Sequence, residues 1–108
     1  MDDRELLELA AKAAGYDYEC TAHTGYPEHD QHQIRNEFGT LVDWNPLADD
    51  GDALRLAVKL LFEIDMRRGC VAISHSTGVK VLEAFNQDPY AATRRAIVRV
   101  AAEVGREK

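Results

Sequence analysis

The sequence lacks the features of a membrane, exported or disulfide-stabilised protein. Its 108 residues contain no apolar run near the roughly 20 residues that span a bilayer. The chain opens with Met1-Asp2-Asp3-Arg4-Glu5 instead of a basic start followed by an apolar segment, so we expect no export signal. The two cysteines, Cys20 and Cys70, are expected to be reduced thiols in such a chain. These absences predict a cytoplasmic protein with no membrane contact.

Proline and glycine are scarce, and the glycine motifs of nucleotide-binding loops are absent. The chain has three prolines and seven glycines, and neither Gly-x4-Gly-Lys nor Gly-x-Gly-x2-Gly occurs. This disfavours chemistry driven by nucleotides. With 45% hydrophobic and 30% charged residues in 12.1 kDa, the composition is that of one globular domain spanning residues 1–108.

The net charge of -6 is unevenly distributed along the chain. Residues 1–52 hold thirteen acidic and three basic side chains, whereas residues 53–108 hold six acidic and ten basic ones. Such asymmetry can favour head-to-tail self-association or binding of an anionic partner. The simpler interpretation is that the two halves intermingle in one fold and neutralise each other.

Three segments have helical periodicity and recognisable ends. An acidic capping pattern predicts a first helix over residues 3–14, with Gly15 as its stop. A run of aspartates opens a second helix, predicted over residues 50–62. An Asp-Pro pair opens the third, predicted over residues 89–105 and ending at Gly105.

The second predicted helix is apolar on nearly every side. Leu54, Val58 and Leu61 form one stripe, and further apolar residues flank it. Only Arg55 and Lys59, four residues apart, make a polar strip. We therefore expect this helix to be the most buried element or to bury its second flank in a partner.

Two hairpins are predicted between the helices. Residues 33–38 and 41–44 alternate around a Gly-Thr turn, and the apolar run 70–73 is followed by a mate at 79–84. Residues 16–31 lose periodicity and are expected to form a loop. The order α-ββ-α-ββ-α predicts an α+β fold, with three helices packed on an antiparallel sheet of about four strands, as in an α/β/α sandwich.

Two motifs carry a resemblance to a known family. Asp43-Trp44-Asn45-Pro46-Leu47 with the following residues 49–60, and the stretch 88–99 that begins Asp-Pro-Tyr, resemble the phage ABA sandwich domain family of small phage and prophage proteins. The resemblance covers about residues 1–14 and 43–105. It implies a helix/sheet/helix sandwich made in a bacterial host, with no established activity and no assigned catalytic residues. A host or phage protein as partner would fit such an accessory protein.

The predicted loop contains the sharpest chemical pattern in the chain. Cys20, His23, His29 and His32 lie within thirteen residues, and thiolate and imidazole are usual ligands of zinc. A metal-binding or small-ligand enzyme that uses this Cys20–His32 loop is therefore one alternative function. The spacing matches no closed structural zinc motif, and loops collect polar residues for other reasons, so exposed side chains without a metal are the simpler interpretation.

Other patterns do not support catalysis. Aligning Gly51 with the glycine of a calcium loop places Pro46 and Ala57 where carboxylates are required. Ser74 and His75 are neighbours in a predicted strand end, where adjacent side chains point to opposite faces. No catalytic residues are assigned, and the sequence favours a protein that is not an enzyme.

Basic residues give the third predicted helix a charged side. Arg94, Arg95 and Arg99, with Arg55 and Lys59 of the second helix, are the candidate interaction residues for nucleic acid or another anionic partner. The pI near 5.1 disfavours nucleic acid as the main ligand, and such arginines often pair with nearby acids instead. The leading prediction is thus a non-catalytic interaction module of phage origin that forms a homo-oligomer.

Overall fold

The computed structural model describes residues 2–21, 30–36 and 38–108, and within these ranges the chain forms three helices and six strands. The α+β class predicted from the sequence is confirmed. In chain order the elements are α1 (Asp3–Ala14), β1 (Asp17–Thr21), β2 (Gln31–Arg35), β3 (Leu41–Asp43), α2 (Asp50–Lys59), β4 (Glu63–Arg67), β5 (Cys70–Ser74), β6 (Lys80–Ala84) and α3 (Pro89–Arg106).

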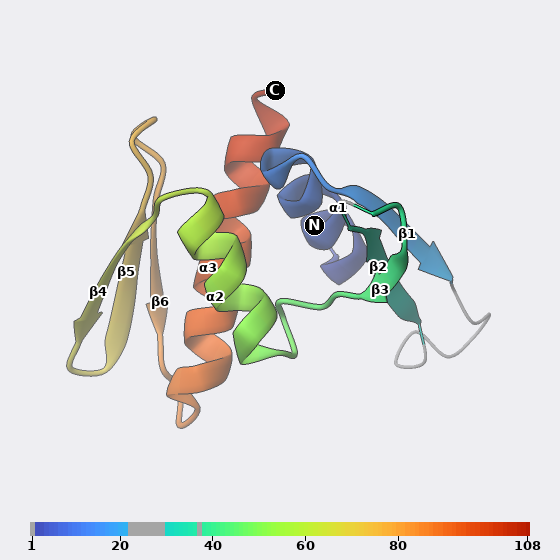
Figure 1. Ribbon diagram of the computed structural model, residues 1–108. Helices are drawn as coiled ribbons and strands as arrows, with labels where there is room; N and C mark the ends of the chain where they lie inside the picture. Colours follow the sequence, from blue (N-terminus) through green and yellow to red (C-terminus); the bar gives the residue numbers. More distant parts are fainter. Residues whose placement is uncertain (1, 22–29, 37) are drawn as a thin grey trace.

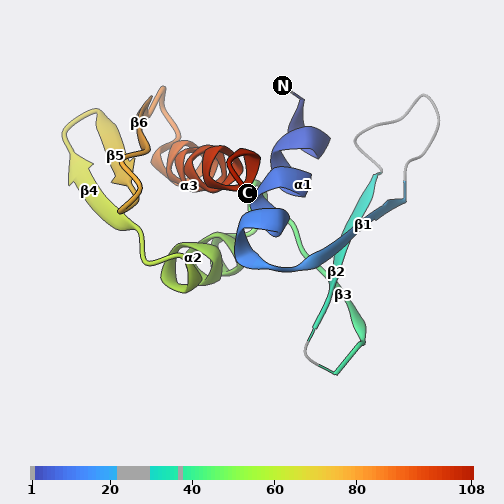
Figure 2. The same ribbon diagram turned by 90° about the horizontal axis from the view of Figure 1, so that it is seen from above.

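The strands form two separate antiparallel sheets, one on each side of the helices (Figures 1 and 2). One sheet has the order β1-β2-β3 and lies beside α1, and the other has the order β4-β5-β6 and packs through β5 and β6 on α3. The expected single sheet of about four strands and the helix/sheet/helix layering are therefore corrected: the helices form the middle layer. Each predicted hairpin is part of a three-stranded sheet: β1 is added to the first hairpin and β4 to the second. Local periodicity does not report which strands pair, so the sequence did not predict these additions.

Side chains at the helix ends explain where the helices begin and stop. Asp2 accepts a hydrogen bond from the Glu5 backbone N–H at 2.9 Å, and Gly15 ends α1 in the left-handed conformation with φ 77°. Asp49 and Asp88 cap α2 and α3 in the same way. The second helix ends at Lys59 rather than at the predicted residue 62, because the backbone turns at Leu61, where φ is 57°.

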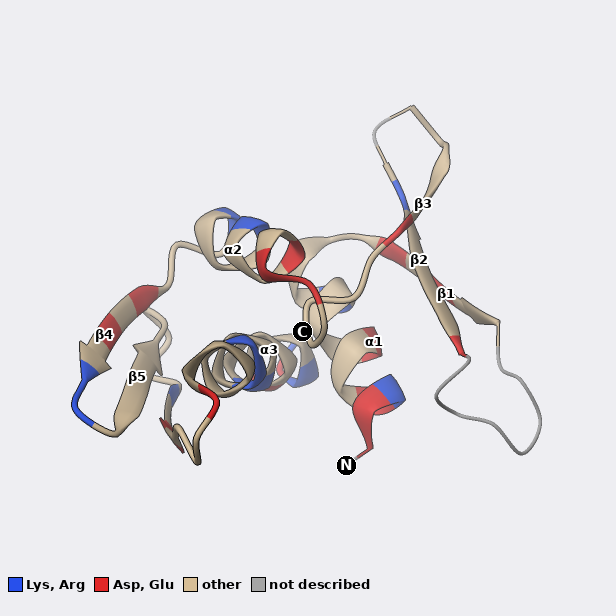
Figure 3. Ribbon diagram, turned by 90° about the horizontal axis from the view of Figure 1, so that it is seen from below, with Lys and Arg blue, Asp and Glu red and all other residues tan. Residues whose placement is uncertain are grey.

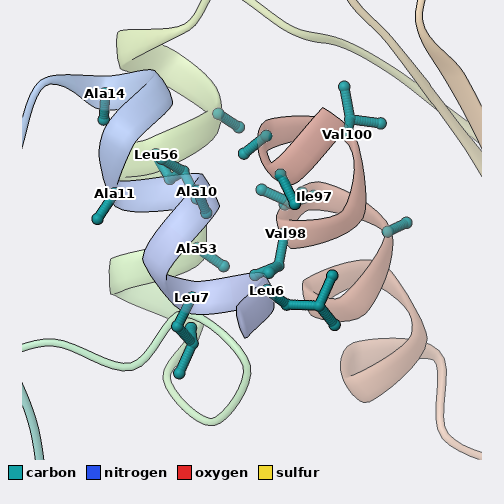
Figure 4. Close-up of a cluster of buried hydrophobic side chains, with 14 of the residues drawn as sticks. Leu6, Leu7, Ala10, Ala11, Ala14, Ala53, Leu56, Ile97, Val98 and Val100 are labelled. Carbon is teal, nitrogen blue, oxygen red and sulfur yellow. The ribbon is translucent and has the colours of Figure 1, made fainter. Parts of the chain in front are cut away.

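The core lies where the three helices meet (Figure 4). It is built of small and branched side chains, among them the fully buried Leu7, Leu56, Val98 and Val100. Ile34 and Trp44 join this core from the side of the first sheet. Val71 and Ile73 join it from the inner face of the second sheet. Both sheets thus depend on the same helical layer for their burial.

Gly105 sits at the closest approach of α1 and α3. The sequence predicted it as a helix stop, but it lies inside α3, which continues to Arg106. A Cβ atom at this position would overlap the carbonyl oxygen of Leu9 and would lie 3.3 Å from the backbone nitrogen of Ala13. The absence of a side chain therefore allows the two helices to pack backbone against backbone.

Candidate functional site

A groove of about 490 Å³ opens between α2, β4 and the start of α3. Its walls are mainly apolar and come from the consecutive elements α2 and β4 and from α3, which lies more than twenty residues further along the chain. The apolar lining consists of Ala53, Leu54, Ile64, Met66, Pro89, Tyr90 and Ile97. Mainly apolar grooves are the default candidates for binding sites, so this groove is the candidate site.

The α2 wall exists because this helix has two apolar flanks and only one of them is covered. Ala53 and Leu56 face the other helices (Figure 4), and both are buried, as is Ala57. Leu54 is 58% exposed and Val58 is 64% exposed. Their four-residue spacing places them on one stripe of the helix. The expectation that this helix would be the most buried element is wrong, since only three of its ten residues are buried. The alternative, that it buries its second flank in a partner, stays a prediction.

The β4 wall follows from the alternation of charged and apolar residues in Glu63–Arg67. Ile64 pairs with Ile73, and Met66 pairs with Val71, so both share the face of the sheet that packs on α3. The two β5 residues are fully buried, whereas Met66 is 56% exposed. This difference arises because α3 packs on β5 and β6, leaving β4 at the outer side of the sheet (Figure 2).

The polar groups at the rim of the groove already have partners. Arg94 donates to the Asp50 carboxylate at 2.6 Å and, through Nε, to the Leu47 carbonyl at 2.9 Å. Thr93 Oγ1 donates to the Pro89 carbonyl at 2.7 Å. The two Arg94 bonds hold the start of α3 against Asp50 at the start of α2 and the segment before it, whereas the Thr93 bond lies within α3. The groove thus combines a mainly apolar wall with rim groups, Thr93 and Arg94, that are already hydrogen-bonded.

The candidate interaction residues on α3 are paired with acids. Besides Arg94, Arg95 lies 3.4 Å from Asp3 and Arg99 lies 2.6 Å from Glu83. Acidic and basic residues accordingly lie interspersed over the helices (Figure 3). This pairing supports the view that these arginines hold elements together rather than form a surface for phosphate.

The two basic residues of α2 lie away from the groove. Arg55 donates to Asp52 at 2.7 Å, and the Lys59 ammonium lies 4.8 Å from the centroid of the Tyr16 ring. Both face the side of α2 that looks toward the first sheet, where they help to line a separate hollow below the β2–β3 hairpin. The apolar stripe, and not this basic strip, is the part of α2 that lacks a covering element.

The structure brings two of the four candidate metal ligands together. Cys20 on β1 and His32 on β2 are directly opposite each other in the antiparallel ladder. The other two, His23 and His29, lie outside the described residues. Within the described part of the chain, no group of three or more His, Cys, Asp or Glu side chains could hold a metal ion. A zinc site on this loop stays a prediction, which titration with zinc followed by melting and mass spectrometry would test.

His32 takes part in a different interaction. Its Nδ1 lies 2.7 Å from the Tyr18 hydroxyl. Burial raises the pKa of the Tyr18 phenol and lowers the pKa of the His32 imidazole, so it disfavours the charged form of both groups. His75 lies on the other sheet, where it contacts Thr77 Oγ1 at 2.8 Å. Of the described imidazoles, His32 and His75 are therefore not brought together.

Another hollow, of about 450 Å³, is lined by acidic side chains that have structural roles. Asp49 and Asp52 both line it, and they accept backbone N–H groups at the start of α2 and at Asn45. Asp43 accepts from two glutamine side chains of β2 at 3.3 and 3.4 Å. Helix capping and strand contacts therefore account for these carboxylates, as the sequence analysis expected for the aspartate run.

The groove residues on β4 were missed by the sequence analysis. The second helix was predicted to reach residue 62 and the next strand to begin at residue 70. Residues 63–67 between them, which include Ile64 and Met66, were therefore not assigned to a strand. The signal was present, since Glu63-Ile64-Asp65-Met66-Arg67 alternates with a period of two before the turn at Gly69. Tyr90, in the first turn of α3, was not singled out either, but it is 70% exposed and lines the groove.

Comparisons of the chain with protein-family models, with curated proteins and with solved structures each gave no match. In the described ranges, none of the helices has the length and apolar character required to cross a membrane.

Proposed function

We propose that this chain is a non-catalytic protein-interaction module that self-associates through the groove between α2, β4 and α3. The observation that carries this proposal is the uncovered apolar flank of α2, which continues across the groove onto Met66 and Tyr90. Burial of such surface is the main favourable term in protein association. The polar groups around it are already paired and add no reactive centre.

A second copy of the chain is the partner that fits these features. A two-fold interface uses the same patch on both subunits, so the patch must be complementary to itself. This patch combines a hollow with a projecting stripe, Leu54 and Val58, on adjacent surfaces of the same molecule. The stripe of each copy can therefore insert into the groove of the other copy.

Light scattering over a range of concentrations tests the self-association. The wild-type chain is expected to approach twice its mass of 12.1 kDa, whereas Leu54→Asp should remain monomeric because it places a charge in the apolar contact. Phe38→Asp is the matched control, because Phe38 is also exposed, at 82%, but belongs to the β2–β3 hairpin on the other side of the molecule. A wild-type chain that stays monomeric at high concentration would contradict the proposal.

We further propose that the module is an accessory protein of a phage or prophage and works in the bacterial cytoplasm. The resemblance of residues 43–60 and 88–99 to the phage ABA sandwich domain family supports this origin. A pull-down from lysate of a bacterial host, with the wild-type chain and the Leu54→Asp variant as parallel baits, tests whether the same surface also binds a host protein. Such a partner should be retained by the wild-type chain and lost from the variant.

A further inference from the structure

The outer edge of β4 has no strand beside it in the described part of the chain. In the sheet order β4-β5-β6, β4 pairs only with β5, and all five of its residues are exposed. Every second residue of such an edge strand directs its backbone N–H and C=O outward. Edge strands are usually protected by shortness, charged side chains, proline or a covering loop; β4 has no proline, and its charged residues, Glu63, Asp65 and Arg67, alternate with the apolar Ile64 and Met66. This edge is therefore available to another strand.

The residue order of β4 is complementary to itself when it is read in the opposite direction. The strand reads Glu63-Ile64-Asp65-Met66-Arg67, with Asp65 at its centre. An antiparallel copy aligned on Asp65 places Glu63 opposite Arg67 and Ile64 opposite Met66. Two ion pairs and two apolar pairs thus arise from five residues.

We infer that the self-association proposed above is an antiparallel pairing of β4 with β4 of a second copy, centred on Asp65. The inference rests on the proposed function and specifies its geometry. The two three-stranded sheets then join into one sheet of six strands, and the groove of each copy meets that of the other at the two-fold axis. The assembly stops at two copies, because β4 is the edge of this sheet that lies next to the groove and each copy uses it once.

The two faces of β4 would have different roles in this pairing. Ile64 and Met66 lie on the groove side, so the apolar pairs extend the surface that Leu54 begins. The charged residues lie on the opposite face, where Arg67 Nε already contacts the Asp65 carboxylate at 2.9 Å. The apolar side therefore supplies most of the binding and the charged side selects the register.

The one unfavourable contact in this alignment is Asp65 against Asp65 of the second copy. Like charges directly opposite each other destabilise a strand pair. Each Asp65 keeps its own Arg67 as a neighbour, and Arg67 of the second copy lies diagonally across, so two guanidinium groups flank the two carboxylates. A second copy is favoured over an unrelated strand because this charge order matches itself.

Charge exchange between Glu63 and Arg67 tests the pairing by sedimentation velocity. Glu63→Arg and Arg67→Glu should each weaken the dimer by about tenfold or more, since each creates two like-charged pairs across the axis. An equimolar mixture of the two variants should restore dimers, because every pair then joins opposite charges. The altered residues are exposed, and among the described residues the ion pair lost is the surface pair of Arg67 with Asp65, so melting curves at dilutions where both chains are monomeric should stay close to the wild type.

A cysteine cross-link gives an independent measurement of the register. In a background with Cys20→Ser and Cys70→Ser, oxidation of Asp65→Cys should give a covalent dimer, because residues directly opposite in an antiparallel pair have Cα atoms about 4.5–5.5 Å apart, which a disulfide can bridge. Leu82→Cys is the matched control: it shares the row Asp65–Ala72–Leu82 on the same face but lies on β6. It should not cross-link.

The possible results separate the inference from the proposed function. Charge-sensitive dimers, restored by mixing, together with a cross-link at position 65, would support β4 pairing. If the wild type dimerises and both charge variants dimerise equally well, or if the cross-link forms at position 82 and not at 65, the β4 pairing is wrong but the interaction module stands. A monomeric wild-type chain would overturn both.

Discussion

Gly105 sets the distance between the two helices that form most of the core. Replacing it with alanine should lower the free energy of unfolding by about 2 kcal/mol, since overpacking against the α1 backbone outweighs the gain in helix propensity of up to about 1 kcal/mol. For a domain of this size the melting temperature should fall by roughly 10 °C. Gly51→Ala is the control. Its Cβ would meet only the flexible ends of Arg55 and Asp49 at 3.2 Å, so stability should be unchanged or higher. Equal effects at both positions would refute the close approach.

His32 makes stability depend on pH in a defined direction. Burial is the main reason that the pKa of the folded-state imidazole lies below its ordinary value near 6.5, although Asp30 and Asp3 act against this. Above about pH 6.5 the ring is neutral in both folded and unfolded chains. As the pH falls, the unfolded chain takes up the proton first, so the free energy of unfolding decreases until the folded-state pKa is passed.

His32→Gln should remove this part of the pH dependence. Urea denaturation of the wild-type chain between about pH 7 and pH 5 is expected to show a steeper loss of stability than the variant shows. His75→Gln serves as the control, since it leaves His32 and its hydrogen bond to Tyr18 in place. A variant with the same slope as the wild type would show that other groups carry the acid sensitivity.

At the scale of elements, the helices were more predictable than the strands. Asp2, Asp49 and Asp88 each bond a backbone N–H three residues ahead, so a local pattern determined where every helix begins. β1 was missed because it lies in a segment rich in polar residues, and only its alternate positions are partly buried. The pairing of strands into two sheets depends on contacts between distant segments, which local periodicity does not contain.

The candidate site was predictable only in part for the same reason. The sequence indicated an apolar excess in this segment, because five of the ten residues of α2 are apolar and do not all lie on one face. Which flank stays exposed depends on where α3 packs. The contribution of β4 required knowing that α3 covers β5 and β6 instead.

The two flanks of α2 should respond differently to truncation. Leu56→Ala removes a fully buried side chain and should lower the free energy of unfolding by about 2–5 kcal/mol. Leu54→Ala, on the exposed flank, should change the stability of the isolated chain by less than about 1 kcal/mol but should weaken self-association. Denaturation at low protein concentration and sedimentation at high concentration separate the two effects. A large loss of stability for Leu54→Ala would place that side chain in the core.

For the whole molecule, the uneven charge of the sequence is largely neutralised by folding. α1 belongs to the acidic half and α3 to the basic half, and they pack against each other. Asp3 pairs with Arg95, and Asp50 pairs with Arg94, in each case an acid of the first half with an arginine of the second. The fold therefore does not keep the halves apart as two opposed charged ends, which head-to-tail association would need.

The salt dependence of self-association distinguishes an apolar interface from a charge-driven one. Raising the salt from about 0.1 M to 1 M shortens the screening length from about 10 Å to 3 Å. Assemblies held head to tail by the net charges of their chains would then dissociate. An interface built on Leu54, Ile64 and Met66 should instead keep its affinity within about a few-fold, since apolar burial is not screened and the Glu63–Arg67 pairs are exposed and weak. Sedimentation velocity should show a mass that levels off at two chains in both buffers. Dissociation at high salt, or a mass that keeps rising with concentration at low salt, would mean that charge rather than the groove drives the assembly.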